Sequence, residues 1–319
     1  MTTAVAKLGT GVLDRIGNTP LVRLERIAAH LPGVQILGKA EWANPGGSVK
    51  DRAASAIVAD AQARGLLGAS FATSGQRLLD ATSGNTGIAY AMLGAALGFG
   101  VTLCMPANVS PERKKILNAY GAEVIYTNPA DGSDGAIRKA RELAADSANQ
   151  FYYADQYSND ANWRAHYRTT APEIWQQTEQ QITHFVAGLG TSGTFMGTTR
   201  RLKEISPAIE CISMQPDSPF HGLEGMKHMA SAIVPRIYDP SLADRNIEME
   251  TEKAYAMAKR LAREEGILMG VSSAANVAAA LQIAEETAAD PRRNNQDTVV
   301  VTILCDSADK YLSERFWEE

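Results

Sequence analysis

The chain has 319 residues, which at about 150 residues per domain predicts two domains with ample material for a hydrophobic core. Its 31 basic and 36 acidic residues leave a net charge of −5 without a long basic run, which disfavours dedicated nucleic-acid binding. With 45% hydrophobic and 21% charged residues, the composition is that of a soluble globular protein and excludes a disordered, collagen-like or disulfide-stapled chain.

Short apolar segments alternate with helical segments through the first half of the chain. The predicted elements are a strand at 78–81, a helix from 87 to 98, a strand at 101–105, a helix at 111–120 and a strand at 123–126. Residues 88–105 carry no charge and approach the length of a membrane helix. Gly98 can end a helix and Pro106 can end a strand, however, so we predict a helix and a buried strand here and no membrane span.

The second half repeats this alternation. The predicted elements are a strand at 183–187, a helix at 194–204, a strand at 209–214, helices at 254–265 and 275–288, and a strand at 298–304. Buried strands separated by helices indicate parallel sheets with helices on both faces. We therefore predict an α/β fold with two open, mostly parallel sheets, in which ligands bind beyond the carboxyl ends of the strands.

The cysteines and histidines do not indicate a metal centre. Cys104, Cys211 and Cys305 each lie in an apolar run, which predicts free, buried thiols in a reducing compartment. No two cysteines have metal-ligand spacing and no HExxH pattern occurs, so a metal enzyme is disfavoured. Residues 1–14 lack the apolar core of a secretory signal, and we expect a cytoplasmic protein.

Three loops rich in Gly, Ser and Thr each precede a predicted helix, at residues 44–52, 81–87 and 188–194. A helix start exposes unpaired N–H groups and a partial positive charge, which together bind anions. Helix capping alone also selects these residue types. The third loop fits G-x-G-x-x-G, the dinucleotide fingerprint, but Asp217 follows its next strand only after a proline, which weakens NAD binding. Thr191, Ser192 and Thr194 suit a phosphate monoester better.

Lys50 lies in the first loop, near the start of the helix predicted after it. A cation in the first helical turn opposes the helix dipole, unless the amine is neutralised, for example as an imine. Lysine amines form Schiff bases with carbonyl cofactors. A phosphate-binding loop together with an imine-forming lysine suggests pyridoxal 5′-phosphate (PLP).

The ordered motifs of the chain resemble those of the cysteine synthase family, which are fold-type II PLP enzymes related to the β subunit of tryptophan synthase. The motifs are IGNTPLV at 16–22, NPGGSVKDR at 44–52, TSGNTG at 82–87, GTSGT at 190–194 and GVSS at 270–273. The similarity extends from about Asp14 to Leu312. It implies a domain at 40–157 with a mobile substrate-binding part, and a second domain, made of 1–39 and 158–319, that holds the PLP phosphate.

Residue by residue, the resemblance makes Lys50 the Schiff-base lysine and proton shuttle, and places Ser272 against the pyridine nitrogen. Asn85 would bind the ring oxygen of the cofactor. The residues implied for the phosphate are Gly190, Thr191, Ser192, Gly193 and Thr194. The residues implied for the substrate carboxylate are Thr82, Ser83, Gly84, Thr86 and Gln156. Because a serine hydroxyl cannot stabilise a protonated ring nitrogen, the resemblance favours expulsion of a β-leaving group.

The implied activity is a transferase reaction, a β-elimination followed by addition, that forms L-cysteine from O-acetylserine or O-phosphoserine and sulfide or a sulfur carrier. The same chemistry with homocysteine or an amine would give cystathionine or diaminopropionate, and this alternative stays open. The resemblance also implies a homodimer, and serine acetyltransferase is a possible partner. The segment 217–229 matches the family only loosely. Its Lys227, near His221 and His228, is either a reader of a phosphate leaving group or a solvated loop lysine.

Overall fold

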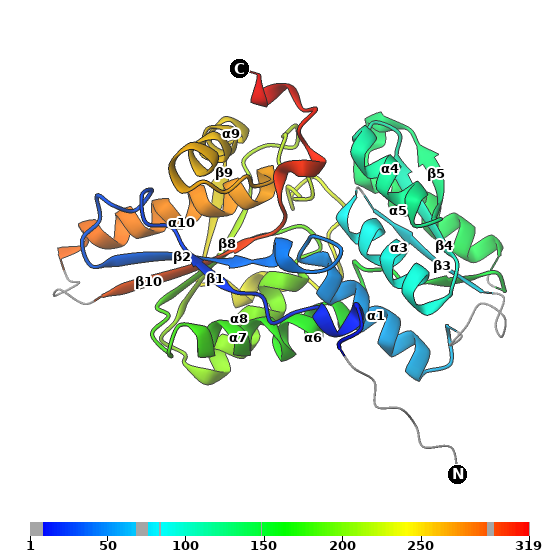
Figure 1. The fold of residues 1–319 in the computed structure, drawn as a ribbon, viewed down its shortest axis with the longest axis horizontal. Coiled ribbons are helices and arrows are strands. Elements are labelled where there is room, and N and C mark those ends of the chain that lie inside the picture. The colour runs from blue at the N-terminus through cyan, green and yellow to red at the C-terminus, as the bar shows by residue number, and fades with distance from the viewer. Residues whose placement is uncertain (1–8, 68–75, 83, 148, 292–296, 319) are drawn as a thin grey trace, which may run out of the picture.

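The computed structural model of the chain describes residues 9–67, 76–82, 84–147, 149–291 and 297–318. Two β-sheets form the centres of two lobes that lie side by side, the larger at the left and the smaller at the right of Figure 1. All strand pairs are parallel except the pair at one edge of the larger sheet. The predicted α/β class with two open, mostly parallel sheets is therefore confirmed.

The larger sheet has six strands in the order β1-β2-β10-β7-β8-β9, with β1 antiparallel to β2. The strands are β1 (Leu21–Arg23), β2 (Val34–Ala40), β7 (His184–Gly188), β8 (Glu210–Pro216), β9 (Arg245–Met249) and β10 (Thr298–Leu304). One face is covered by α9 (Thr251–Arg260) and α10 (Val271–Ala289). The other face is covered by α6 (Asp160–Arg168), α7 (Thr170–Gln177) and α8 (Gly193–Ile205) (Figure 1).

The smaller sheet has four parallel strands in the order β5-β4-β3-β6. They are β3 (Arg77–Ala81), β4 (Val101–Pro106), β5 (Glu123–Thr127) and β6 (Phe151–Tyr153). The helices of this lobe are α1 (Lys50–Ala63), α3 (Asn85–Leu97), α4 (Pro111–Ala119) and α5 (Gly132–Asp146). All six residues of β4 are buried, as a strand covered by helices on both faces requires.

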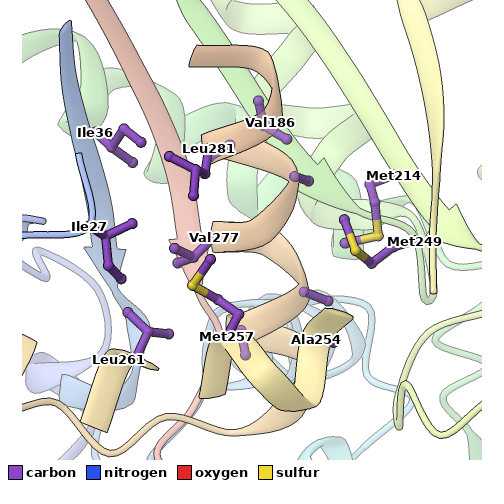
Figure 2. Packing of buried hydrophobic residues seen from close by; sticks show 14 of the residues in the cluster. Ile27, Ile36, Val186, Met214, Met249, Ala254, Met257, Leu261, Val277 and Leu281 are labelled. Atoms are coloured by element: carbon purple, nitrogen blue, oxygen red, sulfur yellow. The ribbon is translucent and has the colours of Figure 1, made fainter. Parts of the chain in front are cut away.

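Each face of each sheet buries its own apolar cluster. Figure 2 shows the cluster beneath α9 and α10, where Ile36, Val186 and Met214 of the sheet meet Val277 and Met257 of the helices. Full burial of one such side chain contributes about 1.5–3 kcal/mol. The packing therefore fixes the strand ends, and the loops that follow them, in a rigid frame.

The predicted elements occur where the sequence placed them, with two differences in extent. The helix predicted at 254–265 is α9, followed by a π-helical turn at Leu261–Glu265, because Gly266 in the left-handed region (φ 71°) ends it. The helix predicted at 275–288 begins four residues earlier, at Val271, directly after an extended Gly270.

Residues 88–105 include most of α3 and of β4, which are separated by Gly98 in the left-handed conformation (φ 80°). Among the described helices, none combines the length and the apolar character needed to cross a bilayer. All three cysteines are free, as predicted, and Cys104 and Cys211 are buried. The prediction of burial was wrong for Cys305, which is half-buried because it follows β10 at the edge of a cavity.

Candidate active site

A cavity of about 710 Å³ lies at the carboxyl ends of strands of both sheets, and residues that follow these strands line it. The predicted residues that line it are Lys50, Thr82, Gly84, Asn85, Thr86, Gln156, Gly190, Thr191, Ser192, Thr194, Lys227 and Ser272. Gly193 is buried in the first turn of α8, and Ser83 lies outside the described residues. The fold thus brings residues of the three predicted loops to one site, together with Gln156, Lys227 and Ser272.

Lys50 is the first residue of α1, as predicted, and it is half-buried at the cavity wall. The segment before it is tied to the end of β10, since the Val49 amide donates to the Cys305 carbonyl (2.9 Å). Asn44 fixes the start of the same loop by donating to the Ser48 carbonyl (3.2 Å). These bonds hold the Lys50 backbone in place while its side chain extends to the cavity.

The loop at 188–194 forms a cradle for an anion at the start of α8. Ser192 is in the left-handed region (φ 69°), and its buried hydroxyl has no hydrogen-bond partner among the described residues. A Cβ atom on Gly190 would lie 2.3 Å from the carbonyl oxygen of Gly225, so only glycine fits there. A strained backbone, an unsatisfied donor and a helix N-terminus together fit a phosphate.

The middle of the cavity presents polar groups to a planar ring. Asn85 donates to the Asp306 carboxylate (2.7 Å), and its own oxygen is buried without a partner in the described part of the chain. Ser272 lies in the first turn of α10, where its hydroxyl contacts the Cys305 thiol. Burial raises the pKa of this thiol to about 11, although the nearby positive charge of Lys50 acts to lower it. The groups present fit PLP, with Lys50 for its aldehyde and 190–194 for its phosphate.

The predicted carboxylate site is a network of short bonds between two loops. The Gln156 amide group donates to the Ala81 carbonyl (2.6 Å), and the Thr86 hydroxyl donates to the Gln156 side-chain oxygen (2.8 Å). The Thr82 hydroxyl accepts from the amides of Gly84 (3.0 Å) and Gly87 (3.2 Å). The network places these groups together at the start of α3, where an anion is favoured.

The outer part of the cavity is crossed by two ion pairs. Lys227, only 4% exposed, bonds Asp134 (2.7 Å) and lies over the Tyr157 ring. The alternative of a solvated lysine is therefore wrong, because this side chain is buried against α5. Arg113 of α4 forms a bidentate pair with Glu224 of the segment 217–229. Each cation at this end already has a carboxylate partner.

Comparison with known proteins agrees with this geometry. Residues 12–306 match the family model described as pyridoxal-phosphate dependent enzyme. The chain is 49% identical to a cysteine synthase of Aquifex aeolicus, over 97% of this chain and 92% of the relative. The chain belongs to the cysteine synthase family of PLP-dependent enzymes.

Two further relatives support the assignment. A cysteine synthase B of Pseudomonas aeruginosa is 42% identical over 96% of this chain and 97% of the relative. The crystal structure of a cysteine synthase from Entamoeba histolytica superimposes with a TM-score of 0.88 at 33% identity, covering 100% of this chain and 94% of that one. The predicted family, cofactor and fold are confirmed, and NAD is not the cofactor of this family.

Several residues of this cysteine synthase family site were missed from the sequence. Cys305, Asp306 and Tyr311 follow β10, and Arg113 and Glu224 meet across the cavity from segments 111 residues apart. One signal was available for the first three, since ligands in parallel sheets bind beyond strand ends and β10 was predicted correctly. The Arg113–Glu224 contact depends on how two lobes pack, which no local pattern records.

Asp80, at the end of β3, is a buried carboxyl behind the substrate loop. Its oxygens accept from the amides of Ala81 (2.8 Å) and Gln156 (3.3 Å). Complete burial raises the pKa of Asp80 from 3.8 to about 8, with nearby Asp155 also raising it. This cysteine synthase family member therefore keeps a protonated carboxyl beneath its substrate loop at neutral pH.

Asp80→Asn should flatten the pH dependence of stability. With a raised pKa, the contribution of Asp80 is complete below pH 3.8, where both states are protonated, and is lost as the pH rises to about 8. Across that window the free energy of unfolding of the wild type should fall, relative to Asp80→Asn, by up to about 1.4 kcal/mol per pH unit. Urea unfolding at several pH values measures this difference; parallel curves for the two proteins would contradict it.

Proposed function

We propose that this cysteine synthase family member forms L-cysteine from O-acetyl-L-serine and sulfide. Bound PLP supplies an electron-withdrawing ring that acidifies the α-proton of an amino acid. Lys50 would hold the cofactor through its ε-amine, and the same amine would remove the α-proton of the substrate and later return it. Loss of the β-substituent and addition of sulfide at the β-carbon complete the replacement.

The other site residues bind and orient. We assign the cofactor phosphate to Gly190, Thr191, Ser192, Gly193 and Thr194, and the ring oxygen to Asn85. Ser272 would lie against the ring nitrogen, where its hydroxyl would leave that atom uncharged. The substrate carboxylate falls to Thr82, Ser83, Gly84, Thr86 and Gln156. The Arg113–Glu224 and Lys227–Asp134 ion pairs line the same cavity.

The donor assignment rests on the charges around the outer cavity. Apart from Lys50, which is assigned to the cofactor, the cations that line the cavity are Arg113 and Lys227, and the carboxylates are Asp131, Asp134, Glu224 and Glu314. A phosphate leaving group would add about two negative charges to the cavity. These charges would lie next to carboxylates that already form ion pairs with Arg113 and Lys227. The acetyl group is neutral, so neither Arg113 nor Lys227 would have to leave its carboxylate partner for it to bind. The paired state of Lys227 is the observation that carries the choice of donor.

A substrate panel tests the proposal. O-acetylserine, O-phosphoserine and serine are each offered with sulfide and with homocysteine, and the amino acid formed is identified. We expect L-cysteine from O-acetylserine, with kcat/KM about 100-fold above that for O-phosphoserine, a difference of about 2.7 kcal/mol. A preference for O-phosphoserine would overturn the donor, and a preference for homocysteine would instead support the cystathionine alternative.

Two charge variants separate the role of Lys227 from general electrostatics. Asp134→Asn frees Lys227 and should raise kcat/KM for O-phosphoserine more than for O-acetylserine. Asp131→Asn removes a carboxylate of the same cavity that instead pairs with Arg138, and should change the ratio less than Asp134→Asn does. Equal effects of both variants on the ratio would show that Lys227 does not read the leaving group.

The organisation of the chain around this chemistry is part of the proposal. We assign 40–157 to a domain that closes over the substrate, and 1–39 with 158–319 to the domain that holds the phosphate. Separate apolar clusters around the two sheets support this division. A homodimer and a serine acetyltransferase partner stay predictions of the family resemblance, and a cytoplasmic location stays a prediction from the sequence.

A further inference from the structure

Helix α6 contacts both halves of the proposed site through one buried side chain. Asn162 is 2% exposed, and its amide group donates to the Gln156 carbonyl (2.8 Å) and to the Thr191 hydroxyl oxygen (3.0 Å). Gln156 is one of the residues assigned to the substrate carboxylate, and Thr191 lies in the loop 188–194, which is assigned to the cofactor phosphate. One side-chain nitrogen therefore joins two segments 35 residues apart in the chain.

The first turn of α8 is seated directly on Asn162. A Cβ atom on Gly193 would lie 1.9 Å from the Asn162 side-chain oxygen, so any larger residue would separate the two helices. One turn later on α6, His166 contacts the Thr194 hydroxyl (3.3 Å) and the Thr170 hydroxyl (2.9 Å). Positions i and i+4 lie on one helix face, so α6 supports the phosphate loop at two points.

The bonds at Thr191 also set the direction of its hydroxyl proton. The Thr191 oxygen accepts from Asn162 and from the Gly193 amide (3.4 Å). A hydroxyl has two acceptor sites and one donor, so with both lone pairs occupied the proton is left to donate elsewhere. Thr191 lines the cavity, and a bound phosphate is the acceptor that this arrangement fits.

We propose that Asn162 is a positioning residue that couples the loop for the substrate carboxylate to the loop for the cofactor phosphate. The inference rests on the proposed function, because it takes Gln156 and Thr191 in those roles. Removing the Asn162 donor frees the Gln156 backbone and releases Thr191 to turn its proton away from the phosphate. Both binding events therefore weaken together, although Asn162 touches neither ligand.

The test measures two dissociation constants for each protein. PLP is first removed from the full-length protein, and the dissociation constant for its rebinding is then measured by equilibrium dialysis. L-methionine, which has the α-carboxylate but no leaving group on its β-carbon, is titrated into the holoenzyme through the absorbance of the cofactor. Asn162→Ala should raise both constants by about fivefold or more, as expected for the loss of a hydrogen bond in each loop. Asn162→Leu keeps a similar volume, loses the donor without adding a charge, and should show the same paired loss if the alanine variant does not fold.

Two control variants isolate the coupling. Asn159→Ala removes the N-terminal cap of the same helix, which accepts from the Ala161 amide (3.0 Å), and should lower the melting temperature while leaving both constants within about twofold. Thr86→Val should weaken L-methionine binding alone. If Asn162→Ala or Asn162→Leu changes only one constant, or if Asn159→Ala reproduces the effects on both, the inference is overturned. A wild-type protein that binds no PLP would instead overturn the proposed function.

Discussion

Lys50→Ala should abolish covalent attachment of PLP and lower the rate of cysteine formation by about 1,000-fold or more. The reason is that this amine has two tasks, to hold the cofactor and to move the α-proton, and water performs neither at this site. The nearest alternative lysines have other partners, since Lys310 donates to the Gly47 carbonyl (2.9 Å) and Lys227 pairs with Asp134. Steady-state kinetics and the absorbance of the bound cofactor measure the effect.

Reduction with borohydride followed by peptide mapping identifies the attachment site directly. The wild type should carry a pyridoxyl group on the peptide that contains Lys50, and Lys50→Ala should carry none. Lys227→Ala is the matched control, since it removes another cavity lysine and should retain the tag. A tag on a different lysine would refute the assignment of Lys50, whatever the kinetics show.

Arg52→Met should lower the free energy of unfolding by about 3–5 kcal/mol. Arg52 is 1% exposed and donates to both oxygens of Glu41 and both oxygens of Glu173, at 2.7–2.8 Å. Lys39 completes the cluster by pairing with Glu173 (2.7 Å). Without the guanidinium, Glu41 is left as a buried charge with no cation at its carboxylate, which accounts for the size of the loss.

Arg64→Met is the matched control on the same helix. Arg64 pairs with Asp60 at the surface, with side chains 61% and 40% exposed, and its loss should cost less than about 1 kcal/mol. Urea unfolding monitored by circular dichroism gives both values. Equal losses for the two arginines would contradict the argument from burial.

The same cluster should make the free energy of unfolding fall in acid. Although burial acts to raise it, Arg52 and Lys39 lower the pKa of Glu173 from 4.5 to about 2. The stability from this group is present above pH 4.5 and is lost as the pH falls towards 2. Arg52→Met should remove most of this dependence, because the carboxylate then loses its main partner.

The fold was predictable because strand and helix periods are local. The segments 78–81 and 298–304 were recognised from their apolar residues alone, and both are central strands. Four strands, β1, β2, β6 and β9, were not predicted. For β1 and β6 the reason is their length, since three residues carry no measurable period. The pairing order of the strands likewise depends on contacts between distant segments.

The site was predictable only in part, for a related reason. Lys50 and the loop 190–194 carry their chemistry in consecutive residues, so a motif reveals them. Asn162 has no such signature, because a single asparagine in a helix acquires its role only when Gln156 and Thr191 fold against it. Lys227 was recognised as a feature of the site, but its burial and its partner on α5 follow from the packing of the lobes.

Lys50 stands where two apolar clusters meet. Val49 packs with the six-stranded sheet, whereas Ala54 and Ile57, within two turns of the same helix, pack with the four-stranded sheet. Neither half of the molecule can present this amine by itself. If the unfolded protein is refolded with added vitamin B6 aldehyde, the appearance of colour would thus report that both halves have come together. A fragment that carries only one half should stay colourless.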